Sequence, residues 1–254
     1  MSDVSGLAHL ACAGAAVVAG VVNAIAGGGT LISFPVLTAV GVPAVRANAT
    51  NTVSLCPGYI SGTYAQRRDL EGLAGHVRPQ LAVAAVGGLL GSVLLVVTSE
   101  SVFRAVVPYL ILAAAVLLAV QNRLRAWVAS RRHGDDHPRR TVELLTIGAA
   151  AIYGGYFGAG LGIMLMAVMG LFSDLPFTRL NAVKQLLAFV INVCAATFLA
   201  FSGKVEWSLV AVMAPGALIG GQLGGRFAGS LPPEKLRVGV IVFAFAVAVV
   251  YLIR

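Results

Sequence analysis

A short polar motif occurs twice in this otherwise apolar chain. The sequence PAVRANATN at positions 43–51 returns as PFTRLNAVK at positions 176–184. Each copy follows an apolar stretch that glycines interrupt, AGGGT at 26–30 and GAGLG at 158–162. The repetition predicts two related halves, each with one cationic, amide-rich patch. Paired and broken hydrophobic segments of this kind favour a membrane transporter whose site lies where the two halves meet.

The composition places the chain in a lipid bilayer. Hydrophobic residues make up 58% of the chain and charged residues only 11%, whereas about a quarter of the residues in a soluble domain are charged. Because a closed barrel would show short alternating strands, the long apolar segments predict an all-α, polytopic membrane protein. The net charge of +8 fits the excess of Lys and Arg that membrane proteins carry on their cytoplasmic side, and no nucleic-acid partner is expected.

The apolar segments divide the chain into two halves. Residues 1–122 are expected to form a first membrane repeat, 123–141 a basic cytoplasmic linker and 142–254 a second repeat. About five segments are expected in each half. They cover residues 7–26, 30–41, 49–65, 79–97 and 105–122, then 142–157, 161–173, 182–202, 207–228 and 236–253. The segments at 30–41 and 161–173 are short for a hydrocarbon core of about 30 Å, so each is expected to be a broken or re-entrant helix.

The distribution of charge predicts that the two halves have opposite orientations. With the basic linker in the cytoplasm, the loop at 67–78 is cytoplasmic and basic, whereas its counterpart around Lys204 and Glu206 lies outside and is nearly neutral. The turn at 98–104 lies outside, and its basic counterpart around Arg226 lies inside. This exchange of charge between equivalent loops is typical of inverted-topology repeats.

The helix that follows each proline carries polar side chains on one face. Its first turn holds Arg46 in one half and Arg179 in the other, next to the unpaired N–H groups and the positive end of the helix dipole. A cation, amides and free N–H donors together predict an anion site, and the two copies are expected to meet near the middle of the protein. The polar face consists of Asn48, Asn51 and Thr52 in the first half and of Asn181, Lys184 and Gln185 in the second.

A structural interpretation of these residues remains open. Asn48 and Asn181 could cap their helices, and the two arginines could reach the lipid headgroups. Lys184 favours the functional interpretation, because an ammonium group inside a membrane segment is costly and usually functional. The glycines have two interpretations of equal weight, close approach of the backbone to a substrate or close packing of helices; the candidates for substrate contact are Gly28, Gly29 and Gly160.

None of the ten acidic residues lies in the middle of an apolar segment, and Asp174 and Glu143 lie at segment edges. Without a carboxylate in mid-membrane, coupling to protons or sodium is not favoured, and an inside-negative potential suffices to expel a monovalent anion. No catalytic set falls inside the membrane segments, so the chain is not expected to be an enzyme, and neither a metal nor a cofactor is expected.

At these residues the chain resembles the sulfite exporter TauE/SafE family of bacterial membrane proteins. The matching stretches are NAIAGGGTL at 23–31, RANATN at 46–51, RLNA at 179–182 and PGALIGGQLG at 215–224. The resemblance implies a multi-pass transporter in the bacterial cytoplasmic membrane that exports sulfite, sulfoacetate or related sulfonates. An anion channel, an uptake permease for another small organic anion and a membrane scaffold are the alternatives. The expected partners are the anion and the lipid bilayer, and the pairs Gly87/Gly91 and Gly216/Gly220 serve either packing within the chain or a homodimer.

Overall fold

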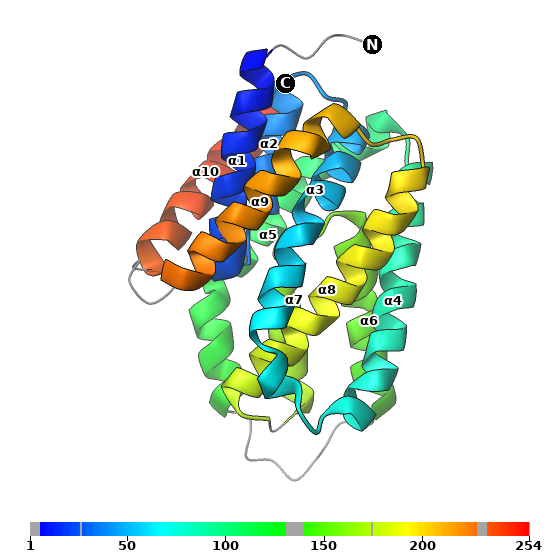
Figure 1. Ribbon diagram of the computed structural model, residues 1–254, viewed down its shortest axis with the longest axis vertical. Helices are drawn as coiled ribbons and strands as arrows, with labels where there is room; N and C mark the ends of the chain where they lie inside the picture. Colours follow the sequence, from blue (N-terminus) through cyan, green and yellow to red (C-terminus); the bar gives the residue numbers. More distant parts are fainter. Residues whose placement is uncertain (1–5, 26, 131–139, 174, 228–232, 254) are drawn as a thin grey trace.

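The computed structural model describes residues 6–25, 27–130, 140–173, 175–227 and 233–253. These residues form α-helices, one short 3-10 helix and their connections, and no strand is found among them, so the all-α prediction is confirmed over the described residues (Figure 1). The helices of the first half are α1 (Gly6–Ile25), α2 (Thr30–Ala39), α3 (Ala44–Ala65), η1 (Arg67–Leu70), α4 (Ala74–Val97) and α5 (Glu100–Ser130). Those of the second half are α6 (Arg140–Tyr156), α7 (Leu161–Phe172), α8 (Phe177–Phe201), α9 (Trp207–Phe227) and α10 (Pro233–Ile253).

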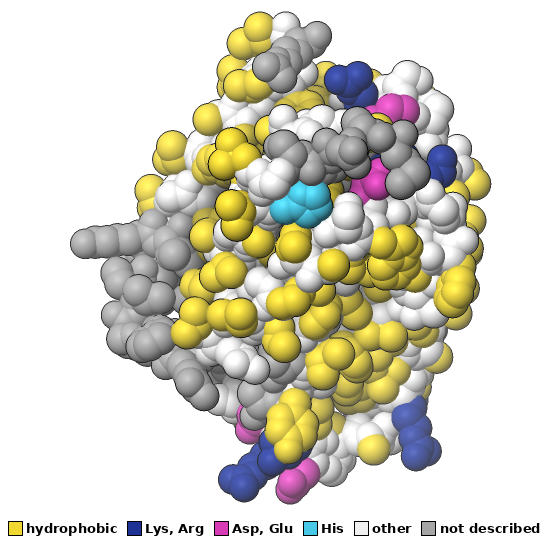
Figure 2. Space-filling model, turned by 45° about the horizontal axis from the view of Figure 1, so that its top comes forward, with side chains coloured by type: hydrophobic (Ala, Val, Ile, Leu, Met, Phe, Trp, Pro, Cys, Tyr) yellow, Lys and Arg dark blue, Asp and Glu magenta, His cyan; other side chains and the backbone are white. Residues whose placement is uncertain are grey.

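Among the residues that the structure describes, five helices are long and apolar enough to cross a membrane, namely α1, α4, α5, α8 and α9. The space-filling view agrees with this, because hydrophobic side chains cover the middle of the visible face and charged side chains gather toward its two ends (Figure 2). The chain is therefore a multi-pass membrane protein. α2 and α7, with 10 and 12 residues, rise only about 15 and 18 Å, which is too short to cross a core of about 30 Å.

The predicted linker is shorter in the structure than expected. α5 continues through Ser130 and α6 begins at Arg140, so residues 123–130 of the expected linker are helical, and 131–139 lie outside the described residues. α3 has 22 residues and yet is not among the helices apolar enough to span a membrane. The reason is its polar composition, and five of its polar side chains are buried inside the protein: Asn48, Thr50, Asn51, Thr52 and Ser54.

Helices of the two halves pack on each other, and each such pair has an equivalent pair in which the two halves have changed places. α1 packs on α9 and α4 on α6; α3 packs on α9 and α8 on α4; α3 and α8 contact each other, as do α5 and α10. In Figure 1, α3 descends from the top and α8 rises from the bottom. The motif prolines have the same conformation in both halves, with φ −53° and ψ 144° at Pro43 and φ −52° and ψ 149° at Pro176.

Glycines allow two of these helix pairs to approach very closely. A Cβ atom added to Gly91 of α4 would lie 2.1 Å from the carbonyl oxygen of Ile152 on α6. In the other pair, a Cβ atom on Gly220 of α9 would lie 2.0 Å from the carbonyl oxygen of Val17 on α1. The small-residue faces predicted from the sequence therefore serve packing within the chain.

Candidate anion-binding site

The two motif arginines lie at opposite ends of the molecule. Arg46 is in the first turn of α3, whereas Arg179 contacts Asp69 and Glu71, which follow the end of that same helix. The distance between the two ends of α3 is about 30 Å at 1.5 Å per residue. The expectation that the two cationic patches meet near the middle of the protein is therefore wrong. The reason is that α3 and α8 run in opposite directions, so that the first turn of α8 lies beside the end of α3.

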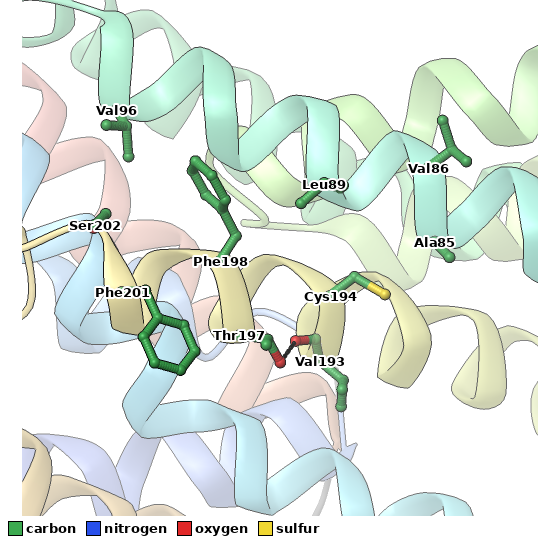
Figure 3. Close-up of a pocket in the computed structure, with 10 residues that line it drawn as sticks. All are labelled: Ala85, Val86, Leu89, Val96, Val193, Cys194, Thr197, Phe198, Phe201 and Ser202. Carbon is green, nitrogen blue, oxygen red and sulfur yellow. Dashed lines mark hydrogen bonds between the residues drawn. The ribbon is translucent and has the colours of Figure 1, made fainter.

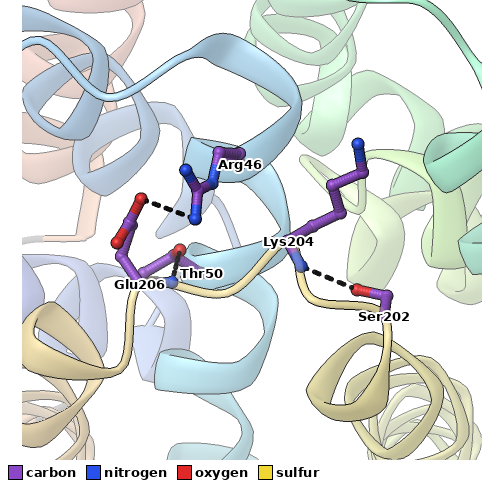
Figure 4. A network of polar contacts seen from close by, with 5 residues as sticks. All are labelled: Arg46, Thr50, Ser202, Lys204 and Glu206. Carbon is purple, nitrogen blue, oxygen red and sulfur yellow. Dashed lines mark hydrogen bonds and ion pairs between the residues drawn. The ribbon is translucent and has the colours of Figure 1, made fainter. Parts of the chain in front are cut away.

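The Arg46 end is closed by carboxylates of the protein itself, and Figure 4 shows the pairing of Arg46 with one of them, Glu206. Arg46 Nη2 lies 3.1 Å from Glu206 Oε1, and the backbone N–H of Glu206 donates to Thr50 Oγ1 over 2.9 Å. Glu100 accepts the N–H groups of Ala44 and Val45 at the start of α3, over 2.5 and 3.0 Å. The first helix start, predicted as an anion site, already has an anion bound from within the chain.

Replacing Glu100 by alanine is expected to lower the free energy of unfolding by about 1–2 kcal/mol, because two N–H groups at the start of α3 lose their acceptor. The matched control is Glu206→Gln, which breaks the ion pair to Arg46. The side chains of that pair are 42% and 30% exposed, so the loss should stay below about 1 kcal/mol. Thermal unfolding in detergent checks the order of the two effects, and an equal or larger loss in the Glu206 variant would contradict it.

The Arg179 end is held by backbone carbonyls. Arg179 Nε donates to the carbonyl oxygen of Asp69 over 3.2 Å, its Nη2 donates to that of Glu71, and Asn181 Nδ2 donates to Gln66 Oε1 over 2.8 Å. Both residues therefore tie the start of α8 to the segment that leads into α4. This contact is the counterpart of the one between Arg46, at the start of α3, and the segment that leads into α9.

The two glycine-interrupted turns meet inside the molecule. A Cβ atom on Gly27 would lie 4.0 Å from the Cα atom of Gly162, so the turn between α1 and α2 contacts the first turn of α7. We call residues 27–30 and 158–162 the glycine junction. Gly27, Gly158 and Gly160 have φ values of 78°, 76° and 75°, which glycine adopts readily and other residues avoid. These three glycines are therefore required by the backbone conformation of the junction.

The polar face of α3 holds both turns of the junction in place. Asn51 Oδ1 accepts from Ser33 Oγ over 2.5 Å, and Asn51 Nδ2 donates to Thr30 Oγ1 over 3.4 Å, which fixes the start of α2. Asn48 Nδ2 donates to the carbonyl oxygen of Tyr156 over 2.7 Å, which fixes the end of α6. These two predicted residues therefore position the junction from the first half of the chain.

The starts of α2 and α7 present backbone donors at the junction. At α2, the first N–H groups with a backbone acceptor are those of Leu31 and Ile32, and none is found for Gly28 or Gly29 among the described residues. At α7, Leu161 donates to Gly158 and Ile163 donates to Gly160, while Gly162 has no backbone acceptor in the same part of the structure. Two helix starts with such N–H groups concentrate positive potential at one place.

Lys184 of α8 extends over the start of α7. A Cβ atom on Gly162 would lie 3.9 Å from both Cδ and Nζ of Lys184. In the equivalent position of the first half, Asn51 contacts the start of α2. The same position in each copy of the motif therefore contacts the start of the short helix of its own half. Gln185 points elsewhere, because its amide nitrogen would lie 2.5 Å from a Cβ atom on Gly62 of α3.

Apolar side chains of α5 and α10 enclose the other side of the junction. A Cβ atom on Gly28 would lie 3.4 Å from Leu118 and 3.8 Å from Val240, and one on Gly160 would lie 3.6 Å from Ala114. Of the predicted site residues, the structure thus brings together Gly28, Gly29, Gly160, Asn51 and Lys184, with Asn48 beside them. Arg46, Arg179 and Asn181 lie at the two ends.

A buried tyrosine adds polar groups that the motif did not predict. The Tyr59 hydroxyl on α3 has the amide side chains of Asn23 on α1 and Asn192 on α8 as its polar neighbours. Asn192 could be anticipated from its helical spacing beyond Lys184. Tyr59 could not, because a single tyrosine in an apolar segment carries no signal that separates it from the core.

A groove between α4 and α8 offers no comparable chemistry. Its volume is about 670 Å³, and it is lined mainly by apolar side chains that include Leu89, Val96 and Phe198 (Figure 3). The hydroxyl of Thr197 at its wall donates to the carbonyl oxygen of Val193 over 2.8 Å. A groove without a positive charge or a free donor does not suit an anion.

Apolar helices around a polar, glycine-lined centre define a multi-pass membrane protein of the transporter class. The family model of the sulfite exporter TauE/SafE matches residues 12–251, and the chain belongs to this family of membrane transporters, not to a family of enzymes.

Curated bacterial relatives carry compatible descriptions. The chain is 27% identical to the "Probable membrane transporter protein ORF9" of Sinorhizobium sp. over 92% of this chain and 88% of the relative. It is 27% identical to the "Probable membrane transporter protein YfcA" of Escherichia coli K12 over 89% and 83%, and 28% identical to a "Probable membrane transporter protein" of Haemophilus influenzae over 94% and 91%. No solved structure matches the chain.

Proposed function

We propose that this protein exports a small sulfur-containing anion, such as sulfite, sulfoacetate or a related sulfonate, across the cytoplasmic membrane of a bacterium. The anion binds at the glycine junction, beside Lys184. The observation that carries the proposal is the position of the Lys184 ammonium over the start of α7, which also contacts the turn that leads into α2. Membership of the sulfite exporter family supports the class of anion, and relatives from bacteria support the membrane.

The electrostatics of the junction favour an anion over a neutral substrate. A cation near the start of a helix is unfavourable by about 0.3–1 kcal/mol, since both carry positive charge. An anion between them offsets this repulsion and accepts hydrogen bonds from the N–H groups of Gly28, Gly29 and Gly162. A sulfonate or sulfite group, with three oxygens around one sulfur, can accept from several converging donors at once.

We infer that the two halves form inverted repeats that move against each other. The exchanged packing of the helix pairs and the opposite directions of α3 and α8 support this arrangement. At each end, a motif arginine of one half contacts the segment that precedes a long helix of the other half. Arg46 pairs with Glu206 before α9, and Arg179 donates to the carbonyl oxygens of Asp69 and Glu71 before α4. Opening the junction to one side separates the contact at that end while the other remains closed.

The membrane potential supports export as the direction of transport. With the negative side inside, each 100 mV favours outward movement of a monovalent anion by about 2.3 kcal/mol. Uptake of the same anion would have to be driven against this term.

The test is anion binding and anion flux with the purified protein. Thermal stability is measured against sulfite, sulfate, sulfoacetate, taurine, phosphate and chloride, and flux is then followed in proteoliposomes. We expect one sulfur anion to raise the melting temperature, as ligand linkage requires, and to be carried with saturable kinetics. Unitary currents would show an anion channel instead. No stabilisation and no flux with any of these anions would refute the proposal and favour a scaffold.

A further inference from the structure

A row of polar side chains lies where α3 and α8 contact each other. On each helix the spacing keeps these side chains on one face, at i, i+4 and i+7 on α3 and at i, i+4 and i+11 on α8. We call the six residues the polar seam: Tyr59, Thr63 and Gln66 of α3, and Asn181, Gln185 and Asn192 of α8. Two predicted site residues, Asn181 and Gln185, thus lie outside the glycine junction but within the seam.

Contacts along the seam join the two helices at its outer end and in its middle. Where α3 ends and α8 begins, Asn181 Nδ2 donates to Gln66 Oε1 over 2.8 Å. About one turn further in, the amide nitrogen of Gln185 would lie 2.5 Å from a Cβ atom on Gly62. The seam therefore leads inward from this end of the molecule, which is the lower end in Figure 1.

The inner end of the seam reaches the glycine junction. Tyr59 has the amides of Asn192 and of Asn23 on α1 as its polar neighbours. A Cβ atom on Gly29 would lie 3.0 Å from the Cβ atom of Asn23, so Asn23 stands between the seam and the junction. Polar groups therefore follow one another from the outer end of the seam to the junction.

The middle of the seam can donate hydrogen bonds to an anion. The Thr63 hydroxyl oxygen is buried and has no hydrogen-bond partner among the described residues. The amide nitrogen of Gln185 faces Gly62, which has no side chain to pair with it. A hydroxyl and an amide NH₂ both donate, and a buried polar group without a partner is unfavourable. An anion between α3 and α8 would supply the missing acceptor.

The other motif helix shows that this position does not need polar side chains for packing. Gln66 follows the motif proline of α3 at the distance at which Leu199 follows that of α8, and Thr63 corresponds in the same way to Ala196. Leu199 and Ala196 are buried and apolar. Polar side chains at only one of the two positions indicate a role that belongs to this end of the protein.

The outer end of the seam lies beside positive charge. Arg179 precedes Asn181 by two residues, and its guanidinium donates to the backbone carbonyls of Asp69 and Glu71. The basic loop at 67–78 directly follows Gln66, and the charge bias assigns this loop to the cytoplasm. Positive charge at the mouth of a polar path raises the local concentration of anions.

We propose that the polar seam is the path by which the anion reaches the glycine junction from the cytoplasm, and that the hydrogen bond between Asn181 and Gln66 closes it. This inference rests on the proposed function for the identity of the anion. The seam itself is neutral, so it replaces part of the hydration of the anion without holding it as firmly as a cation would. Breaking the contact between Asn181 and Gln66 opens the outer end, and Gln185 and Thr63 are then the next donors.

Thiol labelling of the full-length protein tests the path without a substrate. In a background with Cys12, Cys56 and Cys194 replaced by alanine, Gln185→Cys should react with the anionic reagent sulfonatoethyl methanethiosulfonate about tenfold or more faster than Leu186→Cys. Leu186 is its neighbour on α8 and packs against an apolar cluster, where an anion is strongly disfavoured. Mass spectrometry follows the reaction. Thr63→Cys, a change of similar size, is a second reporter, and rates equal to that of Leu186→Cys at both positions would overturn the path.

The same labelling tests the closure at the outer end. Adding Asn181→Ala to the Gln185→Cys protein removes the hydrogen bond to Gln66 and should speed the labelling severalfold. An unchanged rate would overturn the role of this contact as the closure.

Flux in proteoliposomes tests whether the anion uses the path. With sulfite as the probe, Gln185→Leu should lower the flux about tenfold or more, while the affinity from the thermal shift stays within about threefold, because a residue on the path changes rates and not the equilibrium at the junction. Thr197→Val is the control, since it also removes a polar group from α8 but lies in the apolar groove. Wild-type flux in Gln185→Leu would overturn the path. A wild type that binds and moves no anion would refute the proposed function, and the labelling would still decide whether the seam admits anions.

Discussion

Replacing Lys184 by alanine is expected to weaken binding of the transported anion by about 10- to 100-fold. A hydrogen bond to a charged group contributes about 1.5–3 kcal/mol, and 1.4 kcal/mol corresponds to a factor of ten in affinity. Lys184 lies over the start of α7, with its Cδ and Nζ both 3.9 Å from a Cβ atom added to Gly162. Isothermal titration or the anion-dependent shift of the melting temperature measures the change.

Two further variants separate the role of Lys184 from a general loss of positive charge. Lys184→Arg keeps the charge and should retain most of the affinity. Arg46 lies in the first turn of α3, away from the glycine junction, and pairs with Glu206. Arg46→Ala should therefore change the affinity by less than about threefold, within the ~0–1 kcal/mol typical of exposed ion pairs. A folded Lys184→Ala protein with wild-type affinity would rule out the glycine junction as the anion site.

Replacing Gly20 by alanine should produce the largest loss of stability available from a single methyl group in α1. The added Cβ atom would lie 2.5 Å from the carbonyl oxygen of Ala217 and 2.8 Å from the backbone nitrogen of Gly221. Because both are backbone atoms of α9, α1 and α9 must move apart. Overpacking of this kind costs about 1–3 kcal/mol and occasionally more.

Gly14→Ala is the matched control on the same helix. No atom lies within 4 Å of a Cβ added to Gly14, and alanine favours a helix over glycine by about 1 kcal/mol. This variant should therefore be as stable as the wild type or slightly more stable. Reversible unfolding in mixed detergent compares the two proteins, and equal stability of the Gly20 and Gly14 variants would show that the α1–α9 contact is less close than described.

The sequence predicted the helices well, because long apolar segments and prolines act locally. The starts of α3 and α8 directly follow Pro43 and Pro176, and the short α2 and α7 follow the glycine stretches as expected. Lys184 could be singled out because the cost of a charge in a membrane segment depends little on its neighbours.

The arrangement of the site could not be predicted to the same extent. The spacing that put Arg46 and Asn48 on one helix says nothing about which partner each would meet, and Glu206 lies far along the chain from Arg46. Glu143 was assigned to a segment edge for the same reason: its burial is created by α4 packing across it. Contacts between distant segments depend on tertiary packing, which a single sequence with short motifs does not specify.

The polarity of α3 also has a consequence for how the protein enters the membrane. A segment inserts on its own only if the transfer of its side chains into lipid is favourable, and α3 is not among the helices apolar enough for this. Its buried amides and hydroxyls find their partners on α2, α6 and the segment before α9. The last of these is synthesised long after α3, so α3 acquires its stable position in the bilayer only when the second half of the chain has been made.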